Sequence, residues 1–173
     1  MTQTTVPQFP QASIDPEASI APETADRSRS AGRATLKTRI TVVFLGLSGL
    51  LLLFIGGGIL LVPHAFHAGN GIALGADPSL LSEVRAPGGL LVASALFLIC
   101  GSFKAALRLD ALRLAVMVYG SFGLARLVAL AVDGVPSAGL LGSTAIELIV
   151  AALGLALLSG GSKSLAETTR AAG

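Results

Sequence analysis

Two ionisable residues lie inside long apolar runs, where a charged side chain needs a specific reason to be present. Arg126 stands within "YGSFGLARLVALAVDG", and Glu147 stands within "STAIELIVAALG". A guanidinium and a carboxylate that meet away from water form a strong, charge-assisted pair. Such a pair can fix the register of two helices, or it can form one wall of a polar ligand site. Both roles require the two runs to be neighbouring helices.

The positions of these two residues along their runs predict a direct contact. Arg126 lies about 10 Å of helix rise from Asp133, where its run ends. Glu147 lies about 14 Å into the next run, so the two charges differ in depth by only about 3 Å. The short connection "DGVPSAG" makes the two runs antiparallel neighbours. The sequence therefore predicts an Arg126–Glu147 ion pair.

Other polar residues are predicted to join this pair. Tyr119 and Asp133 fall on the helical face of Arg126, because positions three, four or seven residues apart share a face. Glu83 and Arg85 are predicted to form a second pair at a membrane edge. Their helix begins with Asp77 as N-cap and Pro78 as its first residue, and it continues to about Leu107 with a kink at Pro87. The predicted cluster, structural or ligand-binding, comprises Glu83, Arg85, Tyr119, Arg126, Asp133 and Glu147.

Other kinds of chemistry find little support in the sequence. His64 and His67, in "HAFH", are the only candidate metal ligands, and a metal site would need a third ligand. Cys100 is the single cysteine, so no disulfide can form within the chain. The motifs of a hydrolase nucleophile elbow, a phosphate loop and a cysteine–histidine pair are absent from the sequence. We therefore expect no metal and no cofactor, and the sequence leans against an enzyme but leaves that question open.

The composition indicates which elements must position the charged residues. Hydrophobic residues make up 53% of the 173 residues and charged residues only 13%. A soluble domain carries about a quarter charged residues, so lipid is the expected solvent. A net charge of +2 without aromatic residues among the bases argues against a nucleic-acid partner. The sequence predicts an all-α integral membrane bundle with up-down-up-down topology and four spans, at about 40–62, 80–103, 112–132 and 138–158.

The regions outside the spans predict the domain organisation and the orientation. Residues 1–38 are predicted to be a disordered tail because they are rich in Pro, Ser and Thr. Residues 39–160 are predicted to form the transmembrane domain, and residues 161–173 are predicted to form a short second tail. Ten of the twelve Lys and Arg residues lie in or directly beside the two tails and the connection between the second and third spans. Basic loops stay in the cytoplasm, which predicts a bacterial inner-membrane protein with both termini cytoplasmic.

Three segments together resemble a known family. They are "SEVRAPGGLLVASALFL", "GSFGLARLVALAVDGVPS" and "STAIELIVAALGLALL", which contain an E-x-R-x-x-G-G start, a G-x-x-R…D-G-x-P block and a glutamate inside the last span. This order resembles the domain-of-unknown-function family numbered 4345, which implies a small bacterial four-helix membrane protein over about 40–158. A looser similarity to DoxX-like membrane proteins implies a respiratory or redox-linked accessory role.

These observations lead to three functional hypotheses. The first is an accessory or structural membrane component, held together by the Arg126–Glu147 pair, whose partners are the lipid bilayer and a second copy or another membrane protein. The second is a small carrier or ligand-binding protein that uses the polar cluster as its site. The third is a redox subunit that works on a quinone. The sequence favours the first and leaves the other two open.

Overall fold

The computed structural model describes the backbone of residues 16–171 and the side chains of residues 29–159. Within this part of the chain all regular elements are helical, which confirms the predicted all-α fold. The elements are α1 (Pro16–Leu61), α2 (Pro63–Ala68), α3 (Pro78–Phe103), the short 3₁₀ helix η1 (Ala105–Leu107), α4 (Arg108–Asp133) and α5 (Ala138–Ala171).

The helices extend further toward both termini than the sequence predicted. The chain divides into units 1–36 and 37–173, and α1 begins within the first of them, at Pro16. Residues 16–38, predicted to be disordered, are therefore helical, and residues 1–15 lie outside the described part. Ala, Glu and Arg in this segment are good helix formers, and a segment that adjoins a formed helix escapes the cost of nucleation. For the same reason α5 continues to Ala171, through the predicted second tail.

Four helices within the described residues are long and apolar enough to cross a membrane, which supports a multi-pass membrane protein. Their outward side chains are aliphatic or aromatic, as at Phe54, Val128 and Ile149, so the surface of the bundle suits hydrocarbon. These spans are Arg29–Leu61, Pro78–Phe103, Ala105–Asp133 and Ala138–Ser159, close to the four predicted.

The start of α3 agrees with its sequence signals, whereas its end does not. The Asp77 side chain accepts a hydrogen bond from the Leu80 backbone N–H at 2.9 Å, and Pro78 is the first helical residue. Pro87 lies inside the helix. The helix ends at Phe103 rather than near Leu107, because Lys104 is extended and a turn of 3₁₀ helix leads directly into α4.

The packing of α1 against α3 depends on two glycines. A Cβ atom on Gly56 would lie 2.7 Å from the Leu91 Cβ and 2.9 Å from the Gly88 carbonyl oxygen. A Cβ on Gly88 would lie 2.9 Å from the Leu60 backbone nitrogen. The two backbones therefore touch at this crossing, as small residues permit between membrane helices. The neighbouring Gly57 has open space beside it.

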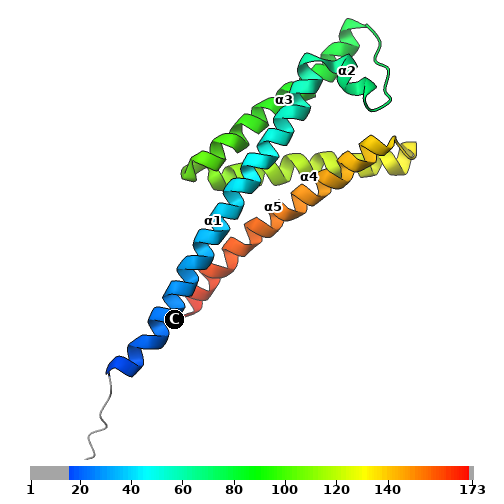
Figure 1. Cartoon of the computed structure of the whole chain (residues 1–173). Coiled ribbons are helices and arrows are strands. Elements are labelled where there is room, and N and C mark those ends of the chain that lie inside the picture. Colours follow the sequence, from blue (N-terminus) through cyan, green and yellow to red (C-terminus); the bar gives the residue numbers. More distant parts are fainter. Residues whose placement is uncertain (1–15, 172–173) are drawn as a thin grey trace, which may run out of the picture. The chain divides into compact units, whose positions relative to one another are not determined.

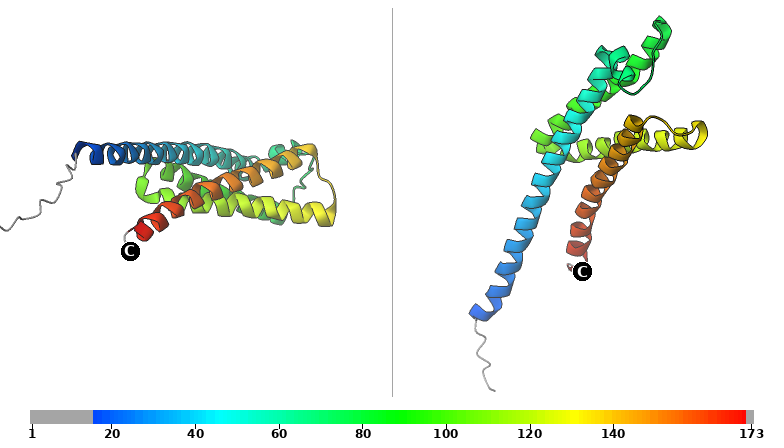
Figure 2. Two further views of the ribbon diagram at one scale, coloured as in Figure 1. Left: turned by 90° about the horizontal axis from the view of Figure 1, so that it is seen from below. Right: turned by 45° about the vertical axis from the view of Figure 1, so that its right-hand side comes forward.

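The helices α4 and α5 are joined by a short turn and pack against each other, and they spread apart with distance from the turn (Figures 1 and 2). Gly134 ends α4 with a φ of 96°, a conformation that favours glycine, so the chain can turn back within a few residues. The buried face of α4 completes the core of the bundle. Its residues are Ala111, Leu112, Ala115, Tyr119 and Gly123.

The helix α2 and residues 69–77 lie at the same end of the bundle as the α4–α5 turn, and we call this the loop end. Pro63 starts α2 and has no N–H to donate to α1, which ends at Leu61. The Phe66 ring packs against Gly58 of α1. Asn70 reaches the start of α5, where a Cβ on Gly139 would lie 3.0 Å from its Oδ1 atom. This segment therefore connects the α1–α3 side of the bundle to the α4–α5 side.

Candidate functional site

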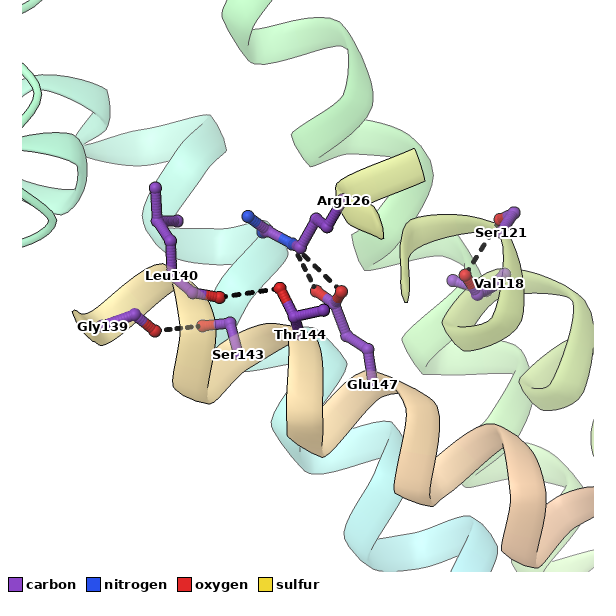
Figure 3. A network of polar contacts seen from close by, with 8 residues as sticks. All are labelled: Val118, Ser121, Arg126, Gly139, Leu140, Ser143, Thr144 and Glu147. Carbon is purple, nitrogen blue, oxygen red and sulfur yellow. Dashed lines mark hydrogen bonds and ion pairs between the residues drawn. The ribbon is translucent and has the colours of Figure 1, made fainter. Parts of the chain in front are cut away.

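The expected ion pair between α4 and α5 is present in the structure. The Arg126 Nε–H donates to both carboxylate oxygens of Glu147, at 3.1 Å to Oε1 and 3.0 Å to Oε2 (Figure 3). The Glu147 side chain is only 9% exposed, whereas the Arg126 side chain is 32% exposed. Gly123 lies one turn before Arg126 and lets α5 approach closely, because a Cβ there would lie 2.8 Å from Leu148. The carboxylate is thus the buried partner of the pair.

Only one of the three guanidinium nitrogens is used by Glu147. The two terminal nitrogens of Arg126 are directed away from the carboxylate (Figure 3), and neither donates a hydrogen bond to any residue in the described part of the chain. A guanidinium has five N–H donors, so four of them remain available here. The charge of Arg126 is therefore balanced, while most of its capacity to donate hydrogen bonds is free.

Arg126 and Glu147 border a cavity of about 200 Å³ between the four spans, which we call the central cavity. Most of its wall is apolar and comes from three helices, as Leu52 and Ile55 of α1, Leu91 of α3 and Phe122 of α4 show. A cavity of about 150 Å³ can hold a molecule the size of benzene, so the space suits a small organic group. The polar groups on its wall are His67, Asn70, Tyr119, Arg126, Ser143 and Glu147.

Two further hollows adjoin the central cavity. One of about 340 Å³, the lateral hollow, lies between α1 and α5 and shares Tyr119 and Glu147 with the central cavity. Its rim includes Phe54 and Ile146, which are 73% and 49% exposed. The other, of about 140 Å³, lies at the α4–α5 turn and is lined by Arg126 and Asp133, among others. Arg126 therefore stands between the central cavity and the turn.

Tyr119 connects the site to the first helix. Its hydroxyl donates a 2.6 Å hydrogen bond to the Ser48 backbone carbonyl of α1, and the residue is 2% exposed. It lies two turns of α4 before Arg126 and borders both the central cavity and the lateral hollow. The predicted face of α4 thus runs from the buried Tyr119 to Asp133, which is exposed at the end of the helix.

The predicted Glu83–Arg85 pair does not form. Arg85 instead donates to the Leu60 backbone carbonyl, one of the carbonyls that α1 leaves without a partner at its C-terminal end. Glu83 is exposed and makes no hydrogen bond or ion pair within the described residues. Residues two apart on a helix point to different faces, which the sequence argument overlooked. Neither residue borders the three hollows.

The two histidines also do not converge. His67 contacts the Pro63 carbonyl through Nδ1 at 2.9 Å, and His64 contacts the Gly75 carbonyl through Nε2 at 3.3 Å. Within the described residues no group of three or more His, Cys, Asp or Glu side chains could hold a metal ion. His67 nevertheless borders the central cavity, so its place is beside the ion pair.

Sequence reasoning missed two polar groups on the cavity wall. Ser143 precedes Glu147 by four residues and therefore shares its helical face, a signal that was available. Its hydroxyl donates to the Gly139 carbonyl at 3.1 Å (Figure 3). Asn70 reaches the site because residues 69–77 fold over the bundle, and nothing in its local sequence indicates this.

The fold and the site define a class of protein: a multi-pass membrane protein of four helices with an arginine–glutamate pair beside an interhelical cavity. The family described as a domain of unknown function, DUF4345, matches residues 40–158, which is more than half of the chain. The chain belongs to this family. The match confirms the resemblance seen in the sequence, and it covers both members of the ion pair. Comparison with curated proteins and with solved structures gave no match.

Proposed function

We propose that this membrane protein binds a small organic ligand in its central cavity, with Arg126 as the main polar contact. The observation that carries the proposal is the arrangement of the guanidinium: Glu147 occupies Nε and leaves both terminal nitrogens free, and Arg126 lines a cavity of about 200 Å³. Ligand pockets are concave, mostly apolar and equipped with a few directional polar groups. The central cavity has these features.

The same geometry weighs against the purely structural hypothesis that the sequence favoured. A pair that served only to fix helix register would gain most from closed, bidentate contact with both terminal nitrogens, with no open space beside it. Here the pair stands at the wall of a cavity, and Asn70, His67 and Ser143 add polar groups around it. A quinone-linked role stays a prediction.

The test uses two serines that make similar hydrogen bonds within their own helices but differ in their surroundings. Ser143 borders the central cavity and Ser121 is exposed on α4, and each hydroxyl donates to a carbonyl of its own helix at 3.1 and 3.0 Å (Figure 3). Ser143→Leu should fill part of the cavity, whereas Ser121→Leu makes the same chemical change at the surface. Mass spectrometry of organic extracts then compares the small molecules that co-purify with the wild-type protein and with each variant.

We expect Ser143→Leu to lose a co-purifying molecule that the wild-type protein and Ser121→Leu retain. Each lost hydroxyl donates only to a carbonyl of its own helix, and the added apolar volume has space in the cavity or at the surface, so the thermal unfolding midpoint of both variants should stay close to that of the wild type. Identical extracts from all three folded proteins would contradict a ligand-binding function and favour the structural hypothesis.

We also propose an orientation, with the loop end outside and both termini in the cytoplasm of a bacterial inner membrane. The distribution of Lys and Arg supports it, since basic loops stay inside. Single cysteines at Ala68 and Lys104, in a Cys100→Ser background, provide the test. Both positions are exposed; Ala68 lies at the loop end, and Lys104 follows α3 at the opposite end of the bundle. A membrane-impermeant thiol reagent added to intact cells should label Ala68→Cys only, and labelling of Lys104→Cys alone would reverse the proposal.

A further inference from the structure

We propose that the ligand is an uncharged, lipid-borne amphiphile whose head group carries hydrogen-bond acceptors and whose chain leaves through the lateral hollow between α1 and α5. This inference rests on the proposed function and names the chemistry of its ligand. It follows from the charges around the central cavity, from the atoms that remain free, and from the position of the lateral hollow.

The charges on the cavity wall are already balanced. Arg126 and Glu147 neutralise each other, and Asp133, which borders the adjoining hollow at the α4–α5 turn, adds a negative charge. An anionic head group would bring a further negative charge without a partner, and a cationic one would compete with Arg126 for Glu147. An unpaired charge within a membrane span is costly. A neutral head group avoids both penalties.

The free hydrogen-bond donors in the cavity require acceptors on the ligand. The terminal nitrogens of Arg126 can only donate hydrogen bonds. The amide nitrogen of Asn70 already donates one N–H to the Phe66 carbonyl at 3.4 Å, which leaves its second N–H as a donor. The Tyr119 hydrogen is already given to the Ser48 carbonyl, which leaves its oxygen as an acceptor. A carbonyl or hydroxyl oxygen on the ligand matches the guanidinium, and hydrogen bonds to a charged donor are stronger than those between neutral groups.

The lateral hollow provides the path for an apolar chain. The helices α1 and α5 approach closely near Phe44, whose ring would lie 3.4 Å from a Cβ on Gly154. Nearer the loop end they leave the lateral hollow, lined by Leu51, Phe54 and Ile146 and joined to the central cavity at Glu147. Phe54 and Ile146 are exposed on the surface that suits hydrocarbon. A chain whose head lies at Arg126 can therefore extend into the bilayer.

The experiment compares two probes with the same chain and different heads, dodecanol and laurate, at alkaline pH where the laurate carboxylate is ionised. A ligand that binds only the folded protein raises its thermal unfolding midpoint, and titration of that shift at constant detergent gives an apparent Kd. We expect the wild-type protein to bind dodecanol about tenfold more tightly than laurate. The free-energy difference behind this ratio is smaller than the cost of placing an unpaired charge within a membrane span.

Glu147→Gln should reverse this preference. The variant removes the negative partner of Arg126 and keeps a side chain of the same shape, so laurate should then bind more tightly than dodecanol. An unchanged preference for dodecanol in the folded variant would overturn the argument from charge balance.

A matched pair of tryptophan substitutions tests the path and does not disturb the ion pair. Ile146 borders the lateral hollow, and Ile149, one turn further along α5, is exposed without bordering any of the three hollows. Ile146→Trp should weaken dodecanol binding about tenfold, while Ile149→Trp should bind as the wild type does. Equal binding by both variants would overturn the lateral path, and this comparison stands even if Glu147→Gln does not fold.

The outcomes separate this inference from the proposed function. Tighter binding of laurate by the wild-type protein would overturn the neutral head group but keep the cavity as a ligand site. Stabilisation by phosphatidylcholine in preference to dodecanol would mean that a bilayer lipid fills the hollow, and would overturn the inference in the same way. If neither probe stabilises the wild-type protein and the extracts of Ser143→Leu and Ser121→Leu are identical, both proposals fail.

Discussion

The α1–α3 contact and the α4–α5 contact hold similar helices together by different means. Between α1 and α3 the backbones touch at Gly56 and Gly88, where no side chain fits. Between α4 and α5 the contact includes the Arg126–Glu147 pair and borders a cavity of about 200 Å³. The first contact leaves no space for a ligand, and the second keeps space next to free hydrogen-bond donors.

We interpret the α1–α3 contact as mainly stabilising and the α4–α5 contact as the one that holds the proposed ligand site. Helices in lipid gain little from the hydrophobic effect between them, so close backbone packing is an effective way to fix a pair. A buried ion pair is a less efficient stabiliser because both charges must leave water. The proposed ligand site would explain its presence on the α4–α5 side, because the free nitrogens of Arg126 would then bind the ligand. The following changes test this division, from the largest expected effect to the smallest.

The largest effect should come from breaking the ion pair on one side only. Arg126→Leu leaves the Glu147 carboxylate buried without a partner and should lower the free energy of unfolding by about 3 kcal/mol. Arg126→Leu/Glu147→Leu should recover most of this loss, because no charge then remains in the apolar site. Thermal or denaturant unfolding in detergent measures both. If the loss of unfolding free energy in the double variant equalled the sum of the losses in Arg126→Leu and Glu147→Leu, the account would be contradicted.

The exposed ion pair near the start of α4 is the matched control. Arg113 and Asp110 lie 3.0 Å apart, and their side chains are 59% and 63% exposed. Arg113→Leu should change the free energy of unfolding by less than about 1 kcal/mol, as expected for an exposed pair. A loss equal to that of Arg126→Leu would show that burial does not distinguish the two pairs.

On the α1–α3 side, a single methyl group should be enough to disturb the contact. Gly56→Ala would force its Cβ against Leu91 and the Gly88 backbone, at a cost of about 2 kcal/mol. Gly57→Ala has open space and should be neutral or more stable by about 0.5 kcal/mol, because alanine is the better helix former. Neither variant should change the co-purifying ligand. Equal midpoints for the two variants would show that this crossing is looser than described.

At the loop end, Arg85 should matter and Glu83 should not. Arg85→Met removes the hydrogen bond to the Leu60 carbonyl and should lower the free energy of unfolding by about 1.5 kcal/mol. Glu83→Gln should leave it unchanged, since Glu83 is exposed and makes no polar contact within the described residues. A comparable loss from Glu83→Gln would instead support the ion pair that the sequence predicted.

The smallest effect should come from the bond that joins the two sides. Tyr119→Phe removes the hydroxyl that donates to the Ser48 carbonyl and should lower the free energy of unfolding by about 1 kcal/mol. Because Tyr119 borders the central cavity and its oxygen can accept a hydrogen bond, the apparent Kd for dodecanol should rise as well. Ser121→Ala, which removes an exposed hydroxyl from the same helix, should change neither quantity.

The fold could be predicted in detail because lipid imposes simple rules. A span must be long and apolar, and the four runs in the sequence satisfy this with recognisable ends at Pro63, Asp77 and Gly134. The Arg126–Glu147 pair could be predicted because a tight turn fixes the depth of two neighbouring helices. At residues 16–38, where composition predicted a disordered tail, the structure has helix, which helix propensity and the adjoining helix favour.

The cavity could not be predicted because it depends on contacts that are distant in sequence. Helical spacing places Arg126 on the inner face of α4 but does not say which nitrogen Glu147 will use. Asn70 and His67 reach the site only because α2 folds back onto α1, where the Phe66 ring meets Gly58. Arg85 was assigned to a nearby carboxylate, whereas the structure gives it a carbonyl at the end of another helix. Proximity in sequence therefore did not identify the hydrogen-bond partner of Arg85.

The most direct test of the central claim is nitrogen-15 NMR of the arginine side chains in lipid nanodiscs, with Arg126 assigned from the spectrum of Arg126→Lys. On titration with dodecanol, the terminal Nη resonances of Arg126 should shift while its Nε resonance stays in place, because Nε remains bound to Glu147. Nη resonances that do not respond while dodecanol binds, or an Nε resonance that moves in their place, would contradict the account.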